Sequence, residues 1–289
     1  MADTRVRAPS YNPFASYEVE VKDIVYRQDG GRTYPARVFQ PRGQGPFPAV
    51  VEVHGGAWMR GDIYQNELLD TRLAASGVVV ATVDFRLSDE APYPASMADI
   101  NYAVRWLKAH AEEFNASSVG AGGMGFSSGG HMIMLNAMRP RDPRYTAITL
   151  TEAPGVDAGV AYVVAGWPVM DPLSRFRYAA TIDRQDLIEA GLKYFIDEAG
   201  MSEANPQHIL DRGEPARLPP ALIVHGAEDA QVTPKTVEIF TESYAQAGGV
   251  IELAKYPGEP HGFAREDTEN TRRAIDAIKS FIARQLIML

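Results

Sequence analysis

Apolar strands that alternate with helices along most of the chain constrain its fold more than any other feature. Segments typical of buried strands lie at 47–56, 78–85, 118–126, 160–169, 220–226 and 250–257, and helical patterns separate most of them. Two earlier segments, 17–27 and 33–41, alternate apolar and polar residues as a hairpin does. The pattern predicts an α/β fold, with an eight-stranded and mostly parallel sheet that helices cover on both faces.

Residues 171–215 break this alternation. They lie between two predicted strands, are rich in Pro, Arg and Tyr, and show only a weak helical pattern at 183–200. The segment is longer than a plain crossover connection needs. We therefore expect a small insertion that caps the carboxyl edge of the sheet, in a chain (1–289) that forms a single domain.

Composition and charge exclude several classes of function. The net charge of −9 is unfavourable for binding nucleic acid. The absence of cysteine excludes disulfides, thiolate metal ligands and a cysteine nucleophile, and no HExxH motif or close His/carboxylate cluster indicates a metal or another cofactor. The first residues, MADTRVRAPSYNPFAS, contain no apolar run of the length that a signal peptide needs, and no stretch approaches the roughly 20 apolar residues of a membrane span. We expect a cytoplasmic protein with no membrane partner; export through an unseen leader is the alternative.

The glycine-rich stretch GGMGFSSGGH at 122–131 joins a predicted strand to a predicted helix. Within it, residues 125–129 match G-x-S-x-G, a sharp turn that projects its central serine from the sheet edge. Glycines two residues before and after that serine relieve clashes with nearby backbone. Ser127 has both glycines, whereas Ser128 has Phe126 at one of these positions. Ser127 is therefore the predicted nucleophile, although the motif alone is equally typical of a structural turn.

A serine nucleophile needs a base and an acid, and hydrolases with this turn carry them in the chain order Ser, Asp/Glu, His. Of six histidines, His261 is the one that fits as the last member; it lies in the loop between the last predicted strand and the last helix. The acid should follow the preceding strand, where LIVHGAEDAQV offers Glu228 and Asp229. We favour Asp229, which would hold the tautomer of His261 and stabilise its cation; Glu228 is the alternative.

The stretch HGGAWMRG at 54–61 is the third candidate element. Attack on an ester carbonyl places negative charge on its oxygen, and preorganised backbone N–H groups stabilise that charge. Glycine-rich backbone after the third strand and the residue after the nucleophile supply such donors. We expect Gly56, Ala57 and Ser128 to form this oxyanion hole, with Gly55 as a further candidate. An ordinary glycine turn is the alternative, and His54 is expected to anchor the loop by hydrogen bonding.

Large apolar residues near these motifs predict an apolar substrate cleft. The motifs place Trp58 and Phe126 beside the nucleophile, Trp167 lies near the end of the next predicted strand, and Met170 and Tyr178 follow that strand. An apolar cleft under a modest cap would suit small to medium esters. Packing in the core is the alternative role for these side chains.

From about residue 20 to the carboxyl terminus, the chain resembles the α/β-hydrolase esterases of the hormone-sensitive-lipase-like and feruloyl/acetyl-esterase-like groups, with kynurenine formamidases close to them. The motifs behind the resemblance are HGGAW, DFRLSDEAPYPASMAD, GFSSGGH, HGAEDAQV and PHGF, in this order. The resemblance implies the α/β-hydrolase fold, a Ser-His-Asp triad, and structural roles for Asp84, Arg86 and Asp99. Two departures, Ala57 in place of a third glycine and Phe126 in place of an aspartate, bear on the acyl substrate rather than on the chemistry.

These features predict a serine carboxylic ester hydrolase that acts on small to medium acyl esters through an acyl-enzyme intermediate, without a cofactor or metal. An amide hydrolase similar to kynurenine formamidase is the alternative enzyme, because HGGxW is also present there. A non-catalytic binding protein on the same scaffold is the third class. A small-molecule ester is the expected partner, and the sequence leaves a monomer and a homodimer both open.

Overall fold

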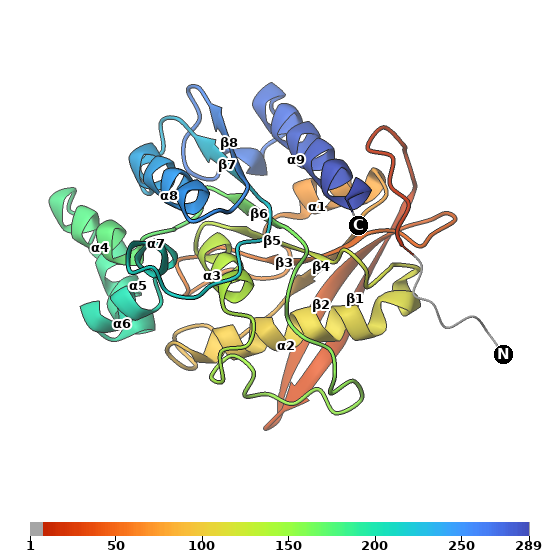
Figure 1. Ribbon diagram of the computed structural model, residues 1–289, viewed down its shortest axis with the longest axis horizontal. Coiled ribbons are helices and arrows are strands. Elements are labelled where there is room, and N and C mark those ends of the chain that lie inside the picture. Colours follow the sequence, from red (N-terminus) through yellow and green to blue (C-terminus); the bar gives the residue numbers. More distant parts are fainter. Residues whose placement is uncertain (1–7, 289) are drawn as a thin grey trace.

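An eight-stranded sheet forms the centre of the molecule, with strands in the order β1-β2-β4-β3-β5-β6-β7-β8 (Figure 1). The computed structural model describes residues 8–288. Strands β1 and β2 form an antiparallel hairpin, β2 pairs antiparallel with β4, and the remaining neighbours run parallel. The strands are β1 (Val19–Asp29), β2 (Arg32–Pro41), β3 (Ala49–Val53), β4 (Val79–Val83), β5 (Gly122–Phe126), β6 (Val163–Gly166), β7 (Ala221–Gly226) and β8 (Ile251–Tyr256). The predicted α/β fold with a mostly parallel, eight-stranded sheet is confirmed.

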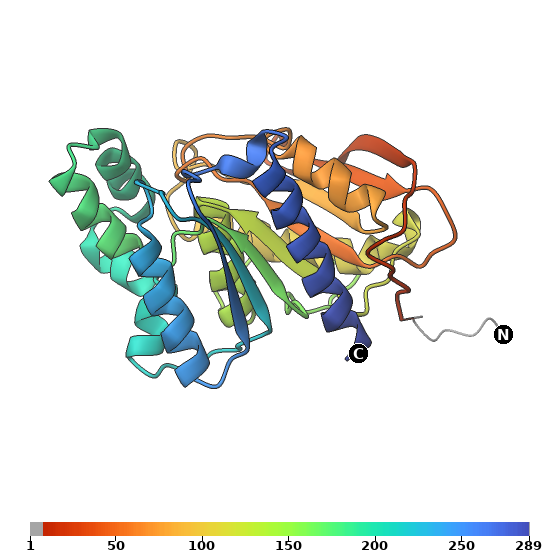
Figure 2. The ribbon, with the colours of Figure 1, turned by 90° about the horizontal axis from the view of Figure 1, so that it is seen from above.

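Helices cover both faces of the sheet (Figure 1 and Figure 2). One face packs against α1 (Glu67–Ala75) and α9 (Glu269–Ile287), which also contact each other. The other face packs against α2 (Ala95–His110), α3 (Ser128–Met138) and α8 (Pro234–Gln246). Within residues 8–288, no helix combines the length and the apolar character that crossing a bilayer would require.

The two helical layers bury two separate apolar cores. Successive side chains of a strand point to opposite faces of the sheet. Val50 therefore packs with Leu73 and Ile278 under α1 and α9, whereas its neighbour Val51 packs under α2 and α3. Because both faces are buried, the central strands are apolar at nearly every position, which is the pattern that identified them in the sequence.

Four further helices lie between β6 and β7, at the left end of the molecule in both views (Figure 1 and Figure 2). They are α4 (Pro172–Thr181), α5 (Gln185–Phe195), α6 (Glu198–Glu203) and α7 (Pro206–Asp211). Helices α4, α5 and α6 pack on one another, and α7 packs on α3 and α8. These helices occupy the segment in which the sequence predicts an insertion, but the weak pattern at 183–200 indicates only one of them.

An ion-pair cluster ties α2 to the first strands. Asp99 in α2 is fully buried, and its carboxylate accepts hydrogen bonds from the backbone N–H and the guanidinium of Arg86, at 2.8–2.9 Å. Arg27 of β1 also lies 2.9 Å from Asp99. A buried carboxylate with two guanidinium partners holds segments far apart in sequence together, which agrees with the structural role that the resemblance implies for Arg86 and Asp99.

Candidate active site

Ser127 occupies the turn between β5 and α3. Its backbone has φ 53° and ψ −118°, a conformation that is costly for a residue with a side chain and that is often found at active sites. The flanking glycines make this turn sterically feasible. A Cβ at Gly125 would lie 2.5 Å from the carbonyl oxygen of Gly129, and a Cβ at Gly129 would collide with that of Val53. The Ser127 N–H donates to Gly166 O at 2.8 Å, which holds the turn against β6.

His261 lies between Ser127 and Asp229. Its Nε2 is 2.9 Å from the Ser127 Oγ, and its Nδ1 is 2.7 Å from Asp229 Oδ2. Because a carboxylate only accepts hydrogen bonds, Nδ1 carries the ring proton and Nε2 accepts the hydroxyl proton. The structure thus brings three residues from separate loops into one chain of hydrogen bonds, with the histidine poised to take a proton from the serine.

The carboxylate of Asp229 is held by its own loop. Its side chain is fully buried, and Oδ1 accepts hydrogen bonds from the N–H groups of Gln231 and Val232 at 2.8 and 2.9 Å. Burial raises the pKa of Asp229, but the interactions with His261 and the bond from Val232 outweigh burial and hold this pKa below its ordinary value. Asp229 is therefore charged at neutral pH, whereas Glu228, the alternative acid, is exposed to solvent.

A second histidine beside Asp229 was not predicted from the sequence. His225 ends β7, and its Nε2 donates to Val232 O at 2.9 Å and lies 3.6 Å from Asp229 Oδ2. Burial lowers the pKa of His225, so the ring is neutral at pH 7. His225 therefore ties together the two ends of the loop that carries Asp229 without adding charge to the site. Its position at the end of an apolar strand was the available signal.

The loop after β3 brings backbone N–H groups to Ser127. Gly56 and Ala57 line the same cavity as Ser127, and no residue of 8–288 accepts a hydrogen bond from either N–H group. The φ values of Gly56, Ala57 and Trp58 are 120°, 55° and 62°, so the loop makes a strained left-handed turn. Ser128 is the first residue of α3, and its N–H is one of those that a helix leaves without an internal partner.

Two buried side chains hold this loop in place. His54 donates from Nδ1 to Gly55 O at 2.8 Å and stacks on Phe85, with ring centroids 4.4 Å apart. Burial lowers the pKa of His54 to about 4, which keeps the ring neutral. The Ser128 Oγ accepts a hydrogen bond from the N–H of Trp58 at 3.2 Å. The anchoring by His54 matches the expectation from sequence, but no local pattern indicates that the Ser128 hydroxyl also holds the loop.

The cavity beside Ser127 has a volume of about 270 Å³. The loop after β3, the helices α4 and α5, and the loops after β7 and β8 all contribute to its walls. Its lining residues are Gly56, Ala57, Arg60, Gly61, Gln65, Ser127, Arg175, Leu187, Gln231, His261 and Arg265. Three of these are arginines and none is an acid, so the cavity is polar and positively charged.

The observed cavity differs from the predicted apolar cleft. Phe126 and Trp167 are each 1% exposed and pack on each other beneath the turn, with ring centroids 5.2 Å apart. Phe126 directly precedes Ser127, so its side chain points to the opposite face of the sheet and joins the core under α9. Met170 and Tyr178 line a neighbouring cavity of about 100 Å³, which shares two lining residues with the cavity beside Ser127. None of these four side chains lines the cavity that contains Ser127.

Trp58, the fifth expected pocket residue, instead links the loop after β3 to two other elements. It is 2% exposed and stacks on Tyr194 of α5, with ring centroids 5.3 Å apart. Its Nε1 donates to His131 Nδ1 in α3 at 3.2 Å, and His131 donates from Nε2 to Ala204 O at 2.7 Å. Trp58 and His131 thus couple the loop beside Ser127 to the helices of the insertion.

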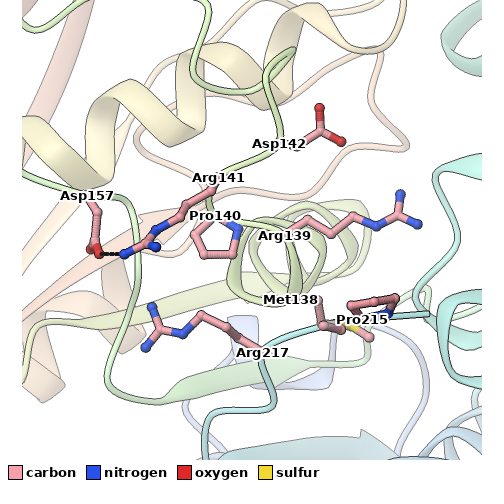
Figure 3. A pocket seen from close by; sticks show the side chains of 9 residues that line it. Met138, Arg139, Pro140, Arg141, Asp142, Asp157, Pro215 and Arg217 are labelled. Carbon is pink, nitrogen blue, oxygen red and sulfur yellow. Dashed lines mark ion pairs between the residues drawn. The ribbon is translucent and has the colours of Figure 1, made fainter. Parts of the chain in front are cut away.

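A larger surface pocket, of about 650 Å³, lies at the other end of α3 (Figure 3). It too contains arginines, and two of the three have acidic partners. Arg139 contacts Glu203 at 3.1 Å and also pairs with Glu214, and Arg141 lies 3.6 Å from Asp157. No serine, threonine or histidine lines this pocket, so the smaller cavity at Ser127 is the candidate active site.

A serine on a strand–turn–helix, followed in the chain by a buried carboxylate and a histidine, all at the carboxyl edge of a mostly parallel sheet, defines the α/β-hydrolase class. The BD-FAE family model matches residues 38–244, and the chain belongs to this family. The match ends before His261. The predicted resemblance to α/β-hydrolase esterases is confirmed.

Relatives in sequence and in structure are named as esterases. Esterase LipC of Mycobacterium tuberculosis is 28% identical over 82% of this chain, and carboxylesterase NlhH of the same species is 25% identical over 96%. This chain spans 58% of the length of LipC and 88% of NlhH.

Two solved structures share the fold. The hyperthermophilic esterase of Pyrobaculum calidifontis is 26% identical, with a TM-score of 0.75, over 91% of this chain and 85% of its own. Esterase 2 of Thermogutta terrifontis, in a form phosphonylated by sarin, is 25% identical, with a TM-score of 0.75, over 92% of this chain and 94% of its own.

Proposed function

We propose that this protein is a serine carboxylic ester hydrolase with Ser127, His261 and Asp229 as its catalytic residues. The observation that carries the proposal is the position of His261, with Nε2 2.9 Å from the Ser127 Oγ and Nδ1 2.7 Å from the Asp229 carboxylate. Membership of the BD-FAE family and the esterase names of the relatives support the reaction class.

The proposed reaction is acyl transfer to water in two steps. Ser127 Oγ attacks the ester carbonyl while His261 Nε2 takes its proton, and Asp229 stabilises the resulting imidazolium. His261 then protonates the departing alcohol, which leaves an acyl-enzyme. A water molecule that gives its proton to His261 attacks this acyl group and releases the acid.

Backbone N–H groups stabilise the negative charge that forms on the carbonyl oxygen. We assign the oxyanion hole to Gly56, Ala57 and Ser128, with Gly55 as a further candidate. The N–H groups of Gly56 and Ala57 are supported by their place at the cavity without an internal acceptor. Each such donor contributes about 3–4 kcal/mol to stabilising the transition state in well-studied hydrolases.

We further propose that α4–α7 form a cap on one domain rather than a domain of their own. Arg175 of α4 and Leu187 of α5 contribute to the wall of the cavity, and Trp58 packs on α5. A cap that closes the cavity to about 270 Å³ supports small to medium esters as substrates.

The location and the partners belong to the same proposal. A cytoplasmic enzyme that acts on a small-molecule ester, with no nucleic-acid or membrane partner, fits the charge of −9 and the absence of cysteine. Cell fractionation tests the location, and recovery in a membrane or secreted fraction would contradict it. Light scattering on the purified protein distinguishes a monomer from a homodimer.

An acyl-ester panel on wild type and Ser127→Ala tests the function. We expect hydrolysis of p-nitrophenyl acetate and butyrate by wild type, and a loss of at least about 10⁴-fold in Ser127→Ala. Undiminished turnover in that variant would overturn the assignment. N-formylkynurenine in the same panel tests the amide-hydrolase alternative, which a higher kcat/KM than for the esters would favour.

A further inference from the structure

Arg175 has no acidic partner, although it lies almost fully inside the protein. The side chain comes from α4 and is only 7% exposed, and it lines the cavity that contains Ser127 and His261. Its Nε is buried without a hydrogen-bond acceptor, and no carboxylate of residues 8–288 forms an ion pair with its guanidinium. Its guanidinium lies over the Trp58 ring, 5.2 Å from the centroid, a contact that leaves the N–H donors unused.

This arrangement is costly unless something else supplies the acceptor. Buried N–H donors and buried charges are normally paired because water no longer solvates them. Arg105, which is equally buried at 8% exposed, follows the rule: it donates to Asn101 Oδ1 at 3.0 Å and to Ile148 O at 2.7 Å. The lack of such partners at Arg175 therefore points to an acceptor that arrives from the cavity.

The surroundings of Arg175 favour an anion as that acceptor. Arg60 and Arg265 line the same cavity, no acidic side chain lines it, and no carboxylate of residues 8–288 pairs with either arginine. The nearby acids are already engaged, because Asp229 accepts from His261 and Asp186 accepts from Arg184 at 2.8 Å. Burial lowers the pKa of Arg175 to about 10, so the guanidinium stays charged at neutral pH.

We propose that the cavity selects esters that carry a carboxylate, with Arg175 as the residue that pairs with it and Arg60 and Arg265 as flanking positive charges. The inference rests on the proposed esterase function and names its substrate class. A guanidinium can donate two parallel hydrogen bonds to one carboxylate. The carboxylate lies in the acyl part or in the alcohol part of the ester and takes no part in the reaction, in which water cleaves the ester bond into an acid and an alcohol.

Two matched substrate pairs test the proposal and show whether the carboxylate lies in the acyl part or in the alcohol part of the ester. Mono-p-nitrophenyl glutarate and its terminal amide differ only in a carboxylate on the acyl side. The pair 4-acetoxybenzoate and 4-acetoxybenzamide differs in the same way on the alcohol side. For each pair we measure the ratio of kcat/KM, anionic over neutral, in wild type and in Arg175→Gln. We expect this ratio to fall at least about tenfold in Arg175→Gln for one of the pairs.

Arg177→Gln is the matched control. Arg177 lies on the same helix, is exposed and pairs with Glu198 at 2.6 Å, so the same change of charge there should leave both ratios unaltered. Thermal unfolding separates a binding role from a structural one. Loss of an unpaired buried charge should leave the Tm of Arg175→Gln unchanged or higher, whereas a lower Tm with unaltered ratios would mean that Arg175 only packs on Trp58 and would overturn the proposal.

Failure of this inference is distinguishable from failure of the proposed function. Hydrolysis of the esters with ratios that Arg175→Gln does not change overturns the inference and leaves the esterase function standing. If no ester is hydrolysed, the esterase function fails. Titration calorimetry then measures the binding of glutarate to Ser127→Ala and tests the anion site by itself. Binding that is lost when Arg175→Gln is added to this variant supports the site, and absence of binding overturns it.

If Arg175→Gln does not fold, Arg265→Gln replaces it as the test variant. We then expect a smaller fall in the ratio of kcat/KM, and an unchanged ratio would contradict the proposal.

Discussion

The two ends of α3 carry two pockets that differ in how their arginines are used. At the C-terminal end, Arg139 pairs with acids of the same chain, and so does Arg141, whose ion pair with Asp157 is drawn in Figure 3. At the N-terminal end, beside Ser127, Arg175 has no such partner. The same residue type therefore serves to hold segments together where acids are supplied, and remains available to a ligand where they are not. The larger volume of the first pocket is no guide to function.

Backbone strain follows the same division. Ala57, Trp58, Ser127 and Trp167, all at or next to the N-terminal end of α3, have positive φ values between 37° and 62°. Residues 138–142, at the other end, have none. Strained backbone persists only where surrounding contacts hold it, and it is typical of sites that position reacting groups. The N-terminal end of α3 is therefore a catalytic end and the C-terminal end a structural end, and substitutions at the two ends should have different effects.

Asp229→Asn should have the largest effect. An asparagine cannot hold the His261 tautomer that accepts the Ser127 proton, and in hydrolases with this constellation the change lowers kcat about 10⁴-fold. We measure kcat with p-nitrophenyl acetate, and an unchanged Tm shows that the variant is folded. Glu228→Gln removes an exposed acid of the same loop and should leave kcat within about twofold. Equal losses in both variants would contradict the assignment of the acid.

Arg139→Gln, at the other end of α3, should affect stability and not activity. It leaves Glu203 and Glu214 without this partner, and we expect a loss of about 1–3 kcal/mol in the free energy of unfolding. Urea denaturation measures this loss, and kcat/KM should stay within about twofold of wild type. A fall in kcat/KM comparable to that of Asp229→Asn would break the division between the two ends.

The bridge from Trp58 through His131 should make stability depend on pH. Burial lowers the pKa of His131 from 6.5 to about 4, and the Arg175 charge acts in the same direction. Between these values the unfolded chain binds the proton and the folded chain does not, so stability falls as the pH falls from 6.5 towards 4, by about 1.4 kcal/mol per pH unit for one group. The free energy of unfolding of wild type minus that of His131→Gln should follow this slope.

The comparison with His131→Gln is needed because other buried groups titrate in the same range. His54 acts in the same sense as His131, with its pKa lowered by burial to about 4. Burial raises the pKa of Glu52 to about 7, so this group stabilises the protein at low pH and loses that contribution as the pH rises. A wild-type-minus-variant difference that does not change between pH 6.5 and 4 would contradict the role of His131.

Ser128→Ala should have the smallest effect. The backbone N–H that we assign to the oxyanion hole remains, but the Trp58 N–H loses its acceptor. We expect kcat to fall less than about tenfold, which corresponds to roughly 1 kcal/mol for one neutral hydrogen bond. A loss as large as that of Ser127→Ala would mean that the glycine register selects the wrong serine.

Local patterns sufficed to predict the sheet and to bring Ser127, Asp229 and His261 forward as candidates. Buried strands are apolar at nearly every position, and the turn at Ser127 needs glycines at defined spacing, so both leave a mark in a short stretch of sequence. The chain order Ser, Asp/Glu, His then selected His261 and the loop that carries Asp229. Each of these signals depends on neighbours in sequence or on a general rule of the fold.

The cavity could not be predicted because it depends on contacts between distant segments. Arg175 lies on α4, which precedes the only helical pattern predicted in this segment, at 183–200, and nothing local shows that its donors lack an acid. Two local patterns nevertheless indicate parts of this region: the starts of two helices and the alternation of strand residues. Asp171-Pro172 and Asn205-Pro206 begin α4 and α7, with each Asp or Asn side chain accepting a backbone N–H, as in a usual helix start. The alternation of strand residues also places Phe126 on the face away from Ser127.

Covalent labelling tests the central claim, that Ser127 is the nucleophile, most directly. Diethyl p-nitrophenyl phosphate transfers its diethylphosphoryl group to an activated serine and releases p-nitrophenol. We predict one added group per chain, which peptide mass spectrometry locates on Ser127 and which is absent from Ser127→Ala. A label on Ser128 or on another residue, or ester turnover that continues without any label, would contradict the account.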